Sequence, residues 1–428
     1  MIGERATRLR RFSKQQNRKG CNCELKMTEG TPRVVFIPDS FHEVNGVANT
    51  SRQFEAFARK HDLPFLCIRA GKRAKPLEQS GNVWTLELPR SFLAIPVEKD
   101  LSFDPAYLRH LPLILETIER FQPDLIHITG PSDNGILGTA LAHRLKVPLA
   151  ASWHTNLHEY AARRAHPLLN LLLRGRSDAA GRWIENSAMK LCALYYSCAR
   201  VLYAPNPGLC SLLERTAHRP CYLMPRGVES DLFHPCRRNR RGGDHEPVLG
   251  FVGRLSVEKN VALLAQVQRE LEQTHGTNFR FLIVGHGAEE PWLRKHLPRA
   301  EFTGVLKGET LATAYANMDL FVFPSHTDTF GNVVLEALSC GVPAIVTPDG
   351  GPATIVCDGV TGRIVPDEGF AGAIAAILED PALHDRMRQS ARSYAVTASW
   401  DSVFEGVYSG YATCFADQRS TAASTLSA

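Results

Sequence analysis

The sequence predicts an α/β protein of two doubly wound domains, each with a parallel sheet, and three observations support this prediction. Short apolar runs typical of buried strands alternate with helix-like segments. This rhythm is interrupted over residues 206–247 and then restarts, which two sheets explain better than one. The 428 residues exceed one ordinary domain, and a composition that is 44% hydrophobic and 22% charged is typical of folded proteins.

The elements of the first domain follow from this alternation. Parallel neighbours in a sheet need crossover connections, and helices between short buried strands supply them. In chain order we expect strands over Val34–Pro38, Pro64–Arg69, Leu125–Thr129 and Leu149–Trp153, with helices over Val47–Lys60 and Asn134–Leu145.

The second domain repeats the pattern after the interruption, and its rhythm fades near Leu378. The polar stretch Arg237–Gly243 predicts a solvated loop just before it. We expect its strands over Val248–Val252, Phe279–Val284, Asp319–Phe323 and Pro343–Thr347. The expected limits are a basic tail over 1–30, an N-terminal domain over 31–215, a C-terminal domain over 216–395, a helix over 396–415 that returns to the N-terminal domain, and a tail over 416–428.

The charge distribution excludes several classes of protein. The formal net charge is +5, but the first 26 residues hold eight basic and two acidic side chains, so the remainder is nearly neutral and does not indicate a nucleic-acid binder. That basic segment predicts a disordered tail, and Met27 is an alternative start. No apolar signal core and no run of about 18 apolar residues appears. The 11 cysteines are odd in number and mostly isolated, which favours reduced thiols in the cytoplasm.

Two features of the first domain are candidates for ligand contact. Asn45-Gly46-Val47 lies between the first strand and its helix, where a backbone without side chain can approach a ligand, although an ordinary turn is the alternative. His154 follows the strand that ends at Trp153, and the carboxyl ends of parallel strands are where such sheets bind ligands. A structural histidine is the alternative.

Two cations follow the first strand of the second domain. Gly253 makes the turn, Arg254 comes directly after it, and Lys259 follows five residues after Arg254. A guanidinium and an ammonium near a strand end suit a diphosphate, whereas two solvated surface charges are the alternative. Val284-Gly285 is another strand end with a glycine.

A second turn, around Gly331, predicts the start of a helix whose free N–H groups favour an anion. Asp328 stands just before the turn, and Glu336 lies about a turn and a half into the helix. These carboxylates are suited to accept hydrogen bonds from sugar and ribose hydroxyl groups, although helix caps are the alternative. Together with the two cations, they point to a nucleotide diphosphate sugar.

These stretches, with Thr327–Ala337, Gly341-Val342-Pro343 and Pro225-Arg226-Gly227-Val228, resemble the retaining glycosyltransferases of family 4. The resemblance runs from about Val34 to Tyr411 and implies the GT-B fold, two Rossmann-like domains facing a central cleft. It implies the catalytic residues His154, Arg254, Lys259 and Asp328. It also implies the donor-binding residues Asn45, Gly46, Gly253, Arg254, Lys259, Gly285, Val305, Asp328, Thr329, Phe330, Gly331, Asn332 and Glu336. The family's usual residue at Asp328 is glutamate, one methylene longer.

The resemblance implies a hexosyltransferase that retains the anomeric configuration and needs no cofactor. Fixed positive charge stabilises the leaving diphosphate, and no metal is expected because no Asp-x-Asp sequence occurs in the chain. Two rivals are a GT-B protein that does not transfer, either an epimerase or a nucleotide-sugar binding protein, and a NAD-dependent oxidoreductase. The oxidoreductase fits poorly because no Gly-x-Gly-x-x-Gly follows the first strand.

Donor and acceptor are less closely defined. Mannose from GDP-mannose is favoured over a UDP-hexose, and the acceptor is expected to be a lipid or glycan hydroxyl. Residues 158–205 combine arginines with a leucine-rich stretch, which suits peripheral contact with the inner face of a membrane. A core helix with solvated arginines is the alternative.

Overall fold

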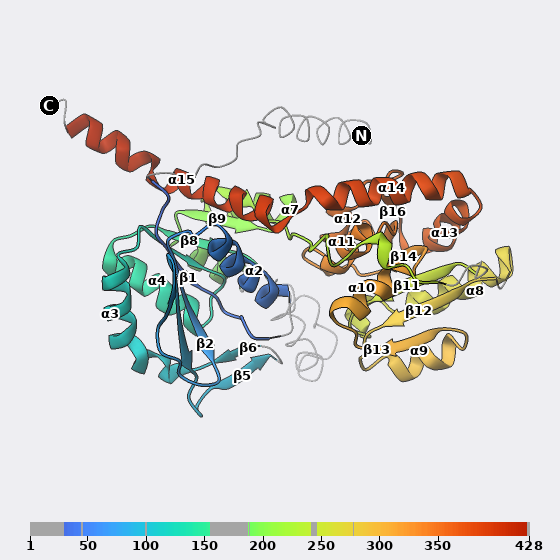
Figure 1. Ribbon diagram of the computed structural model, residues 1–428, viewed down its shortest axis with the longest axis horizontal. Coiled ribbons are helices and arrows are strands. Elements are labelled where there is room, and N and C mark those ends of the chain that lie inside the picture. The colour runs from blue at the N-terminus through green and yellow to red at the C-terminus, as the bar shows by residue number, and fades with distance from the viewer. Residues whose placement is uncertain are drawn as a thin grey trace. The chain divides into compact units, whose positions relative to one another are not determined.

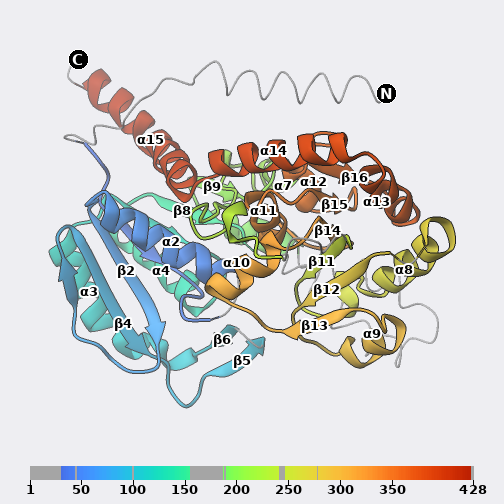
Figure 2. The same ribbon diagram turned by 45° about the vertical axis from the view of Figure 1, so that its right-hand side comes forward.

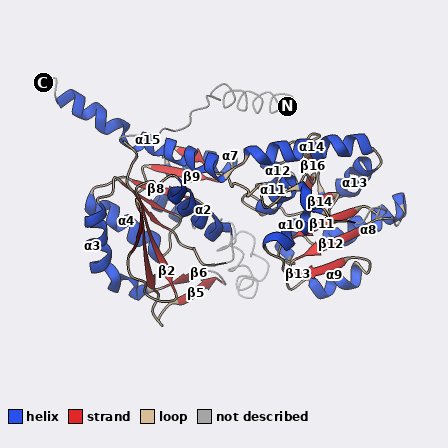
Figure 3. Ribbon diagram, in the orientation of Figure 1, coloured by secondary structure: helices blue, strands red, loops and turns tan. Residues whose placement is uncertain are grey.

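The computed structural model describes residues 30–43, 46–98, 101–154, 187, 189–240, 246–276 and 278–425. The chain divides into a short unit, Met1–Pro32, and a large unit, Arg33–Ala428, that contains every element named below. The tail predicted over 1–30 therefore lies outside the described residues except for Gly30. The large unit combines helices and strands (Figure 3), which alternate except where strands follow one another over residues 65–103 and helices over residues 370–425.

The first sheet has eight strands in the order β10-β9-β8-β7-β1-β2-β4-β3. Figure 1 labels β1, β2, β8 and β9 among them. All neighbours are parallel except β3 and β4. The strands are β1 (Val34–Ile37), β2 (Phe65–Gly71), β3 (Glu78–Ser80), β4 (Val83–Pro89), β7 (Leu125–Ile128), β8 (Leu149–Ser152), β9 (Val201–Ala204) and β10 (Cys221–Leu223). Its helices are α2 (Gly46–Lys60), α3 (Leu111–Phe121), α4 (Asp133–Leu145) and α7 (Pro207–Ala217). A separate antiparallel pair, β5 (Ile95–Glu98) and β6 (Leu101–Phe103), precedes a 3-10 turn over Pro105–His110.

The N-terminal sheet extends beyond residue 215, where we expected the first domain to end. β10 pairs with β9, with Tyr222 opposite Tyr203, and it follows α7 in the chain. This short strand was missed because only three residues pair and they are only partly buried. The crossing to the second domain therefore begins after Leu223.

The second sheet has six parallel strands in the order β13-β12-β11-β14-β15-β16. They are β11 (Val248–Val252), β12 (Arg280–Val284), β13 (Glu301–Gly304), β14 (Leu320–Phe323), β15 (Ala344–Val346) and β16 (Gly362–Ile364). The helices are α8 (Ala262–His275), α9 (Glu290–His296), α10 (Gly308–Ala316), α11 (Asn332–Ser339), α12 (Pro352–Ile355), α13 (Phe370–Leu378) and α14 (Pro381–Thr397). After β11 the chain adds β12 and β13 on one side of the sheet, and it then adds β14, β15 and β16 on the other side of β11. Sheets of this kind bind their ligands where the strand order reverses in this way, which here is between β11 and β14.

Each sheet has its own apolar core. One cluster of buried residues includes Val35, Ile68 and Ile126 from the first sheet, and the other includes Phe251, Ile283 and Phe321 from the second. Together with the parallel pairing, this confirms two doubly wound α/β domains.

The last helix, α15 (Trp400–Thr425), packs against α2 and β9 of the first sheet (Figure 2). The rings of Phe54 and Phe404 stack with centroids 4.5 Å apart, and the Tyr203 hydroxyl donates to Val407 O at 2.8 Å. The two segments that pass between the sheets are also joined, because Val228 N donates to Ala398 O at 3.0 Å. A Cβ at Gly227 would lie 2.4 Å from Trp400 N, so this approach requires glycine.

The stretch predicted as a solvated loop, Arg237–Gly243, differs from that expectation in its described part. Arg238 and Arg240 both bind the carboxylate of Asp319, at 2.8 and 2.5 Å, and the Arg240 side chain is only 8% exposed. Asp319 also accepts from Val248 N. The two arginines therefore hold the segment between the two sheets against the starts of β11 and β14. The polarity of the sequence did not indicate this contact. Residues 241–243 lie outside the described ranges.

Candidate active site

The turn after β11 presents two cations. Arg254 has a side chain that is 60% exposed, with Nη1 3.9 Å from Glu258 Oε1, so its guanidinium is only loosely held. Gly285, at the end of β12, shows how closely the backbones approach here. A Cβ on it would lie 1.9 Å from Gly253 O, and its φ is +138°, which favours glycine. Gly285 N donates to Gly304 O at 2.8 Å, and the exposed Val305 follows, so Gly253, Gly285 and Val305 share one edge of the sheet.

Lys259 and Asp328, which the sequence analysis placed in one site, are in contact. Lys259 Nζ lies 2.5 Å from Asp328 Oδ1, and both side chains are about one-fifth exposed. The other oxygen of this carboxylate, Oδ2, is buried and has no hydrogen-bond partner among the described residues. An ion pair with one unused acceptor therefore lies between β11 and the loop before α11.

The loop from Thr329 to Gly331 is held in place before α11 begins. Gly331 has φ +95°, a conformation that favours glycine and that starts the helix at Asn332. Asp328 O accepts from Gly351 N at 2.7 Å, and a Cβ at Gly351 would lie 2.3 Å from the Cα of Phe330. The first N–H groups of a helix have no carbonyl one turn earlier, so this end of α11 can donate to an anion.

Glu336 lies on α11 and lines a small cavity of about 30 Å³, enough for about two water molecules. The cavity lining consists of Asn49, Gly227, Val228, Glu229, Phe233, Asn332, Glu336 and Trp400. Glu336 Oε2 accepts from the Tyr315 hydroxyl at 2.8 Å. Burial raises the pKa of Glu336, the Tyr315 hydrogen bond lowers it and the nearby Glu229 carboxylate raises it, so that together they bring it to about 7. The side chain is therefore close to half ionised at neutral pH.

Residues of the first sheet reach this loop. Asn206 caps α7, where its Oδ1 accepts from Leu209 N at 2.9 Å, and its Nδ2 donates to Thr329 O at 2.7 Å. A Cβ at Gly46 would be 3.5 Å from Asn332 Nδ2, so the start of α2 faces α11. Asn45 lies outside the described residues.

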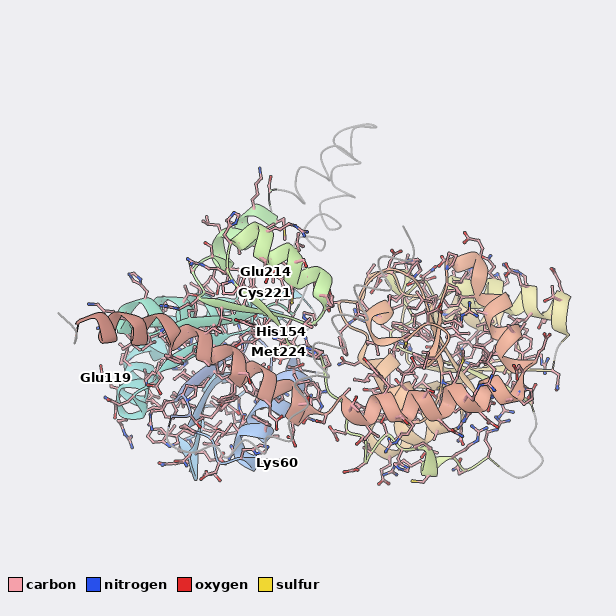
Figure 4. All side chains as sticks on the ribbon, turned by 90° about the horizontal axis from the view of Figure 1, so that it is seen from above. Lys60, Glu119, His154, Glu214, Cys221 and Met224 are labelled. Atoms are coloured by element: carbon pink, nitrogen blue, oxygen red, sulfur yellow. The ribbon has the colours of Figure 1, made fainter. Side chains whose placement is uncertain are left out.

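His154 is buried at the end of β8, and both of its ring nitrogens have protein partners. Nδ1 lies 2.7 Å from Arg226 Nη2, and Nε2 lies 2.7 Å from Ser152 Oγ. Burial lowers its pKa well below the usual value, and the charge of Arg226 adds to this. Arg226 also donates to Met224 O, so its guanidinium links His154 to the segment that follows β10. Figure 4 labels His154 and Met224.

Sequence reasoning missed three residues of this arrangement: Asn206, Tyr315 and Glu229. Of the three, only Glu229 could have been found from the sequence, because it directly follows Arg226-Gly227-Val228, a stretch that carries part of the family resemblance. Asn206 and Tyr315 act through contacts to residues 123 and 21 positions away, which no local pattern shows. Among the described residues, no group of three or more His, Cys, Asp or Glu side chains is arranged to hold a metal ion.

The fold and this site define a class: nucleotide-sugar glycosyltransferases of GT-B fold. Solved structures agree on the fold. The sucrose-phosphate synthase of Thermosynechococcus elongatus has a TM-score of 0.65 at 20% identity, covering 90% of this chain and all of that one. Anabaena HepE in complex with UDP-glucose has a TM-score of 0.61 at 15% identity, covering 89% and 99%.

The family models "Glycosyltransferase Family 4" and "Glycosyl transferases group 1" match residues 44–232 and 246–380. A GDP-mannose-dependent alpha-mannosyltransferase of Mycolicibacterium smegmatis is 31% identical over 70% of this chain and 76% of its own length. A second GDP-mannose-dependent alpha-mannosyltransferase, from Corynebacterium glutamicum, is 29% identical over 89% of this chain and 88% of its own length. The sulfoquinovosyl transferase of Arabidopsis thaliana is 29% identical over 64% and 54%. The chain belongs to this family of group 1, family 4 glycosyltransferases, and it uses a nucleotide-sugar donor.

Proposed function

We propose that this protein is a retaining hexosyltransferase that moves mannose from GDP-mannose to a hydroxyl group of a lipid or glycan. The observation that carries the proposal is the Lys259–Asp328 pair, with its unused carboxylate oxygen, beside Arg254 and the start of α11. Cations and helix N–H groups suit the diphosphate, and the free carboxylate oxygen suits a sugar hydroxyl. The preference for mannose draws on the mannosyltransferase relatives, whereas the sulfoquinovosyl relative makes another hexose the second candidate.

The chemistry requires negative charge to be stabilised where it develops. As the bond from the anomeric carbon to the phosphate oxygen breaks, charge grows on the diphosphate while the sugar becomes cationic. Arg254, Lys259 and the N–H groups of α11 then stabilise the transition state more strongly than they stabilise the bound donor. The acceptor hydroxyl attacks from the side of the departing phosphate, which takes the hydroxyl proton, so the configuration is retained. In this proposal no metal ion takes part.

The remaining residues divide between the sugar and the nucleotide. Asp328 Oδ2 accepts from hydroxyls of the transferred sugar, while Glu336 accepts from ribose hydroxyls once it is ionised. His154 lies near the sugar, but with both ring nitrogens engaged it does not act as a base. That role falls to the departing phosphate.

We also propose that the acceptor is presented at a membrane surface. Most of residues 158–205 lies outside the described ranges, but Leu191 and Leu194 are 69% and 68% exposed and adjoin Lys190. Exposed leucines beside basic side chains suit an anionic lipid surface. Among the described helices, none is both long and apolar enough to cross a bilayer.

A panel of nucleotide sugars tests the proposed donor. A donor present at 100 times its dissociation constant stabilises the protein by about 2.7 kcal/mol, which thermal unfolding detects readily. GDP-mannose is expected to give the largest shift and to be slowly hydrolysed in the absence of acceptor. A UDP-hexose giving the larger shift would replace the mannose assignment. Conversion of the free nucleotide sugar into an epimer would replace transfer itself.

A further inference from the structure

A chain of hydrogen bonds runs through buried side chains from Arg226 to Tyr411. Arg226 Nη2 is 2.7 Å from His154 Nδ1, and His154 Nε2 is 2.7 Å from Ser152 Oγ. Ser152 Oγ is 3.1 Å from His127 Nε2, and His127 Nδ1 is 2.5 Å from the Tyr411 hydroxyl. All five residues are at most 7% exposed, so water does not compete strongly for these bonds.

The arginine determines where the hydrogen of His154 lies. A guanidinium only donates, so His154 Nδ1 must accept and therefore carries no hydrogen. A neutral imidazole then has its hydrogen on Nε2, and that N–H donates to Ser152 Oγ. Arg226 thus selects one of the two neutral tautomers.

The remaining hydrogen bonds, from Ser152 to Tyr411, run in the same direction. Ser152 Oγ, having accepted from His154, has one hydrogen, and His127 Nε2 is within reach to accept it. His127 then carries its hydrogen on Nδ1 and donates it to Tyr411. The Tyr203 ring stacks on His127 with centroids 5.5 Å apart, which fixes the plane of that imidazole.

Charge as well as geometry favours a neutral His154. Burial lowers the pKa of His127 to about 3, and burial lowers that of Arg226 only to about 10, so Arg226 keeps its charge at neutral pH. Protonating His154 would put a second buried cation in contact with the first, with no carboxylate among its described partners.

We propose that Arg226 is a positioning residue that holds His154 in one neutral tautomer and one orientation, and that Ser152, His127 and Tyr411 support it from the other side. Arg226 belongs to the segment that passes from the first sheet to the second, and Tyr411 belongs to α15, which follows the return. Arg226 contacts His154 directly, and Tyr411 reaches it only through His127 and Ser152. The inference rests on the proposed function only in placing His154 beside the transferred sugar.

Nitrogen NMR of the full chain with labelled histidine tests the tautomer without any substrate. In the native protein we expect the long-range couplings of the His154 ring to show hydrogen on Nε2, unchanged from pH 8 to 5.5. Arg226→Met should lose that fixed tautomer and show hydrogen on Nδ1 as well as on Nε2, because burial alone keeps the ring neutral, while Arg226→Lys, which keeps a charged donor, should restore it. Ser152→Ala should leave the hydrogen on Nε2, because Arg226 remains. Hydrogen on Nδ1, or a charged ring, in the native protein would overturn the inference.

Turnover at saturating donor tests whether this state matters, since saturation removes the effect of Glu336 on donor binding. Because burial alone still keeps His154 neutral, Arg226→Met should lower kcat at every pH through loss of the fixed tautomer, and Arg226→Lys, which keeps a charged donor, should recover it. Ser152→Ala should lower kcat equally at every pH, as loss of support alone would. Native kcat in Arg226→Met, or no recovery in Arg226→Lys, would overturn the positioning role. Absence of any glycosyl transfer would instead contradict the proposed function while leaving the NMR result standing.

Discussion

Replacement of Lys259 by alanine is expected to remove most of the turnover. The ammonium lies 2.5 Å from Asp328 Oδ1, and the Lys259 side chain is only about one-fifth exposed, so water replaces the ammonium poorly. Loss of one fixed stabiliser of developing charge typically costs about 2.7–4 kcal/mol of transition-state stabilisation, roughly a hundred- to thousandfold in rate. Steady-state kinetics at saturating donor should therefore show kcat falling by that factor, while the donor KM changes by less than about tenfold.

A fold defect must be separated from this catalytic effect. Lys259→Ala leaves the Asp328 carboxylate without its cation, which we expect to destabilise the fold by about 1–3 kcal/mol. Adding Asp328→Asn should recover stability but not turnover. Arg294→Ala removes a more exposed cation that pairs with Glu290 in the same domain, and it should leave kcat unchanged. Native turnover in Lys259→Ala would refute the reasoning.

Three further outcomes are expected. Because the Glu336 pKa is raised to about 7, kcat/KM for the donor should rise with pH through about 7 and then level off, and Glu336→Gln should abolish this rise. Asn206→Ser keeps an α7 cap but loses the bond to Thr329 O, so donor KM should rise while the melting temperature barely changes; Asn206→Ala should also lose about 1 kcal/mol of stability in thermal unfolding. Deleting residues 2–26 should leave transfer to a soluble acceptor intact, and a large loss of kcat would show that the basic segment takes part in the reaction.

Local sequence pattern predicted the central strands of both sheets and the residues at their ends, but not β3, β4, β9 and β10 of the first sheet or β13 and β16 of the second. Val248–Val252 reads as a buried strand and is β11 with the same bounds, because an apolar run between a polar loop and a glycine turn allows few alternatives. Lys259 and Asp328 lie 69 positions apart yet were placed together, because parallel strands bring their carboxyl ends to one edge.

Long-range side-chain contacts were beyond such reasoning. His127 reads as an interruption in an apolar strand, and its contact with Tyr411 spans 284 positions. Arg238 and Arg240 read as solvent-exposed, but their partner Asp319 lies about 80 positions away. In each case a polar residue inside or beside the core is stable only because a distant element supplies its hydrogen-bond partner. The hydrophobic periodicity of the local sequence does not indicate which residue that partner is.

The configuration of the sugar released from the donor tests retention itself, because its measurement needs no knowledge of the acceptor. Proton NMR can follow hydrolysis of GDP-α-mannose by the purified protein faster than the free sugar interconverts. The account predicts that α-mannose appears first and that Arg254→Ala slows its release by roughly a hundred- to thousandfold. First appearance of β-mannose, or release at the native rate by the variant, would contradict it.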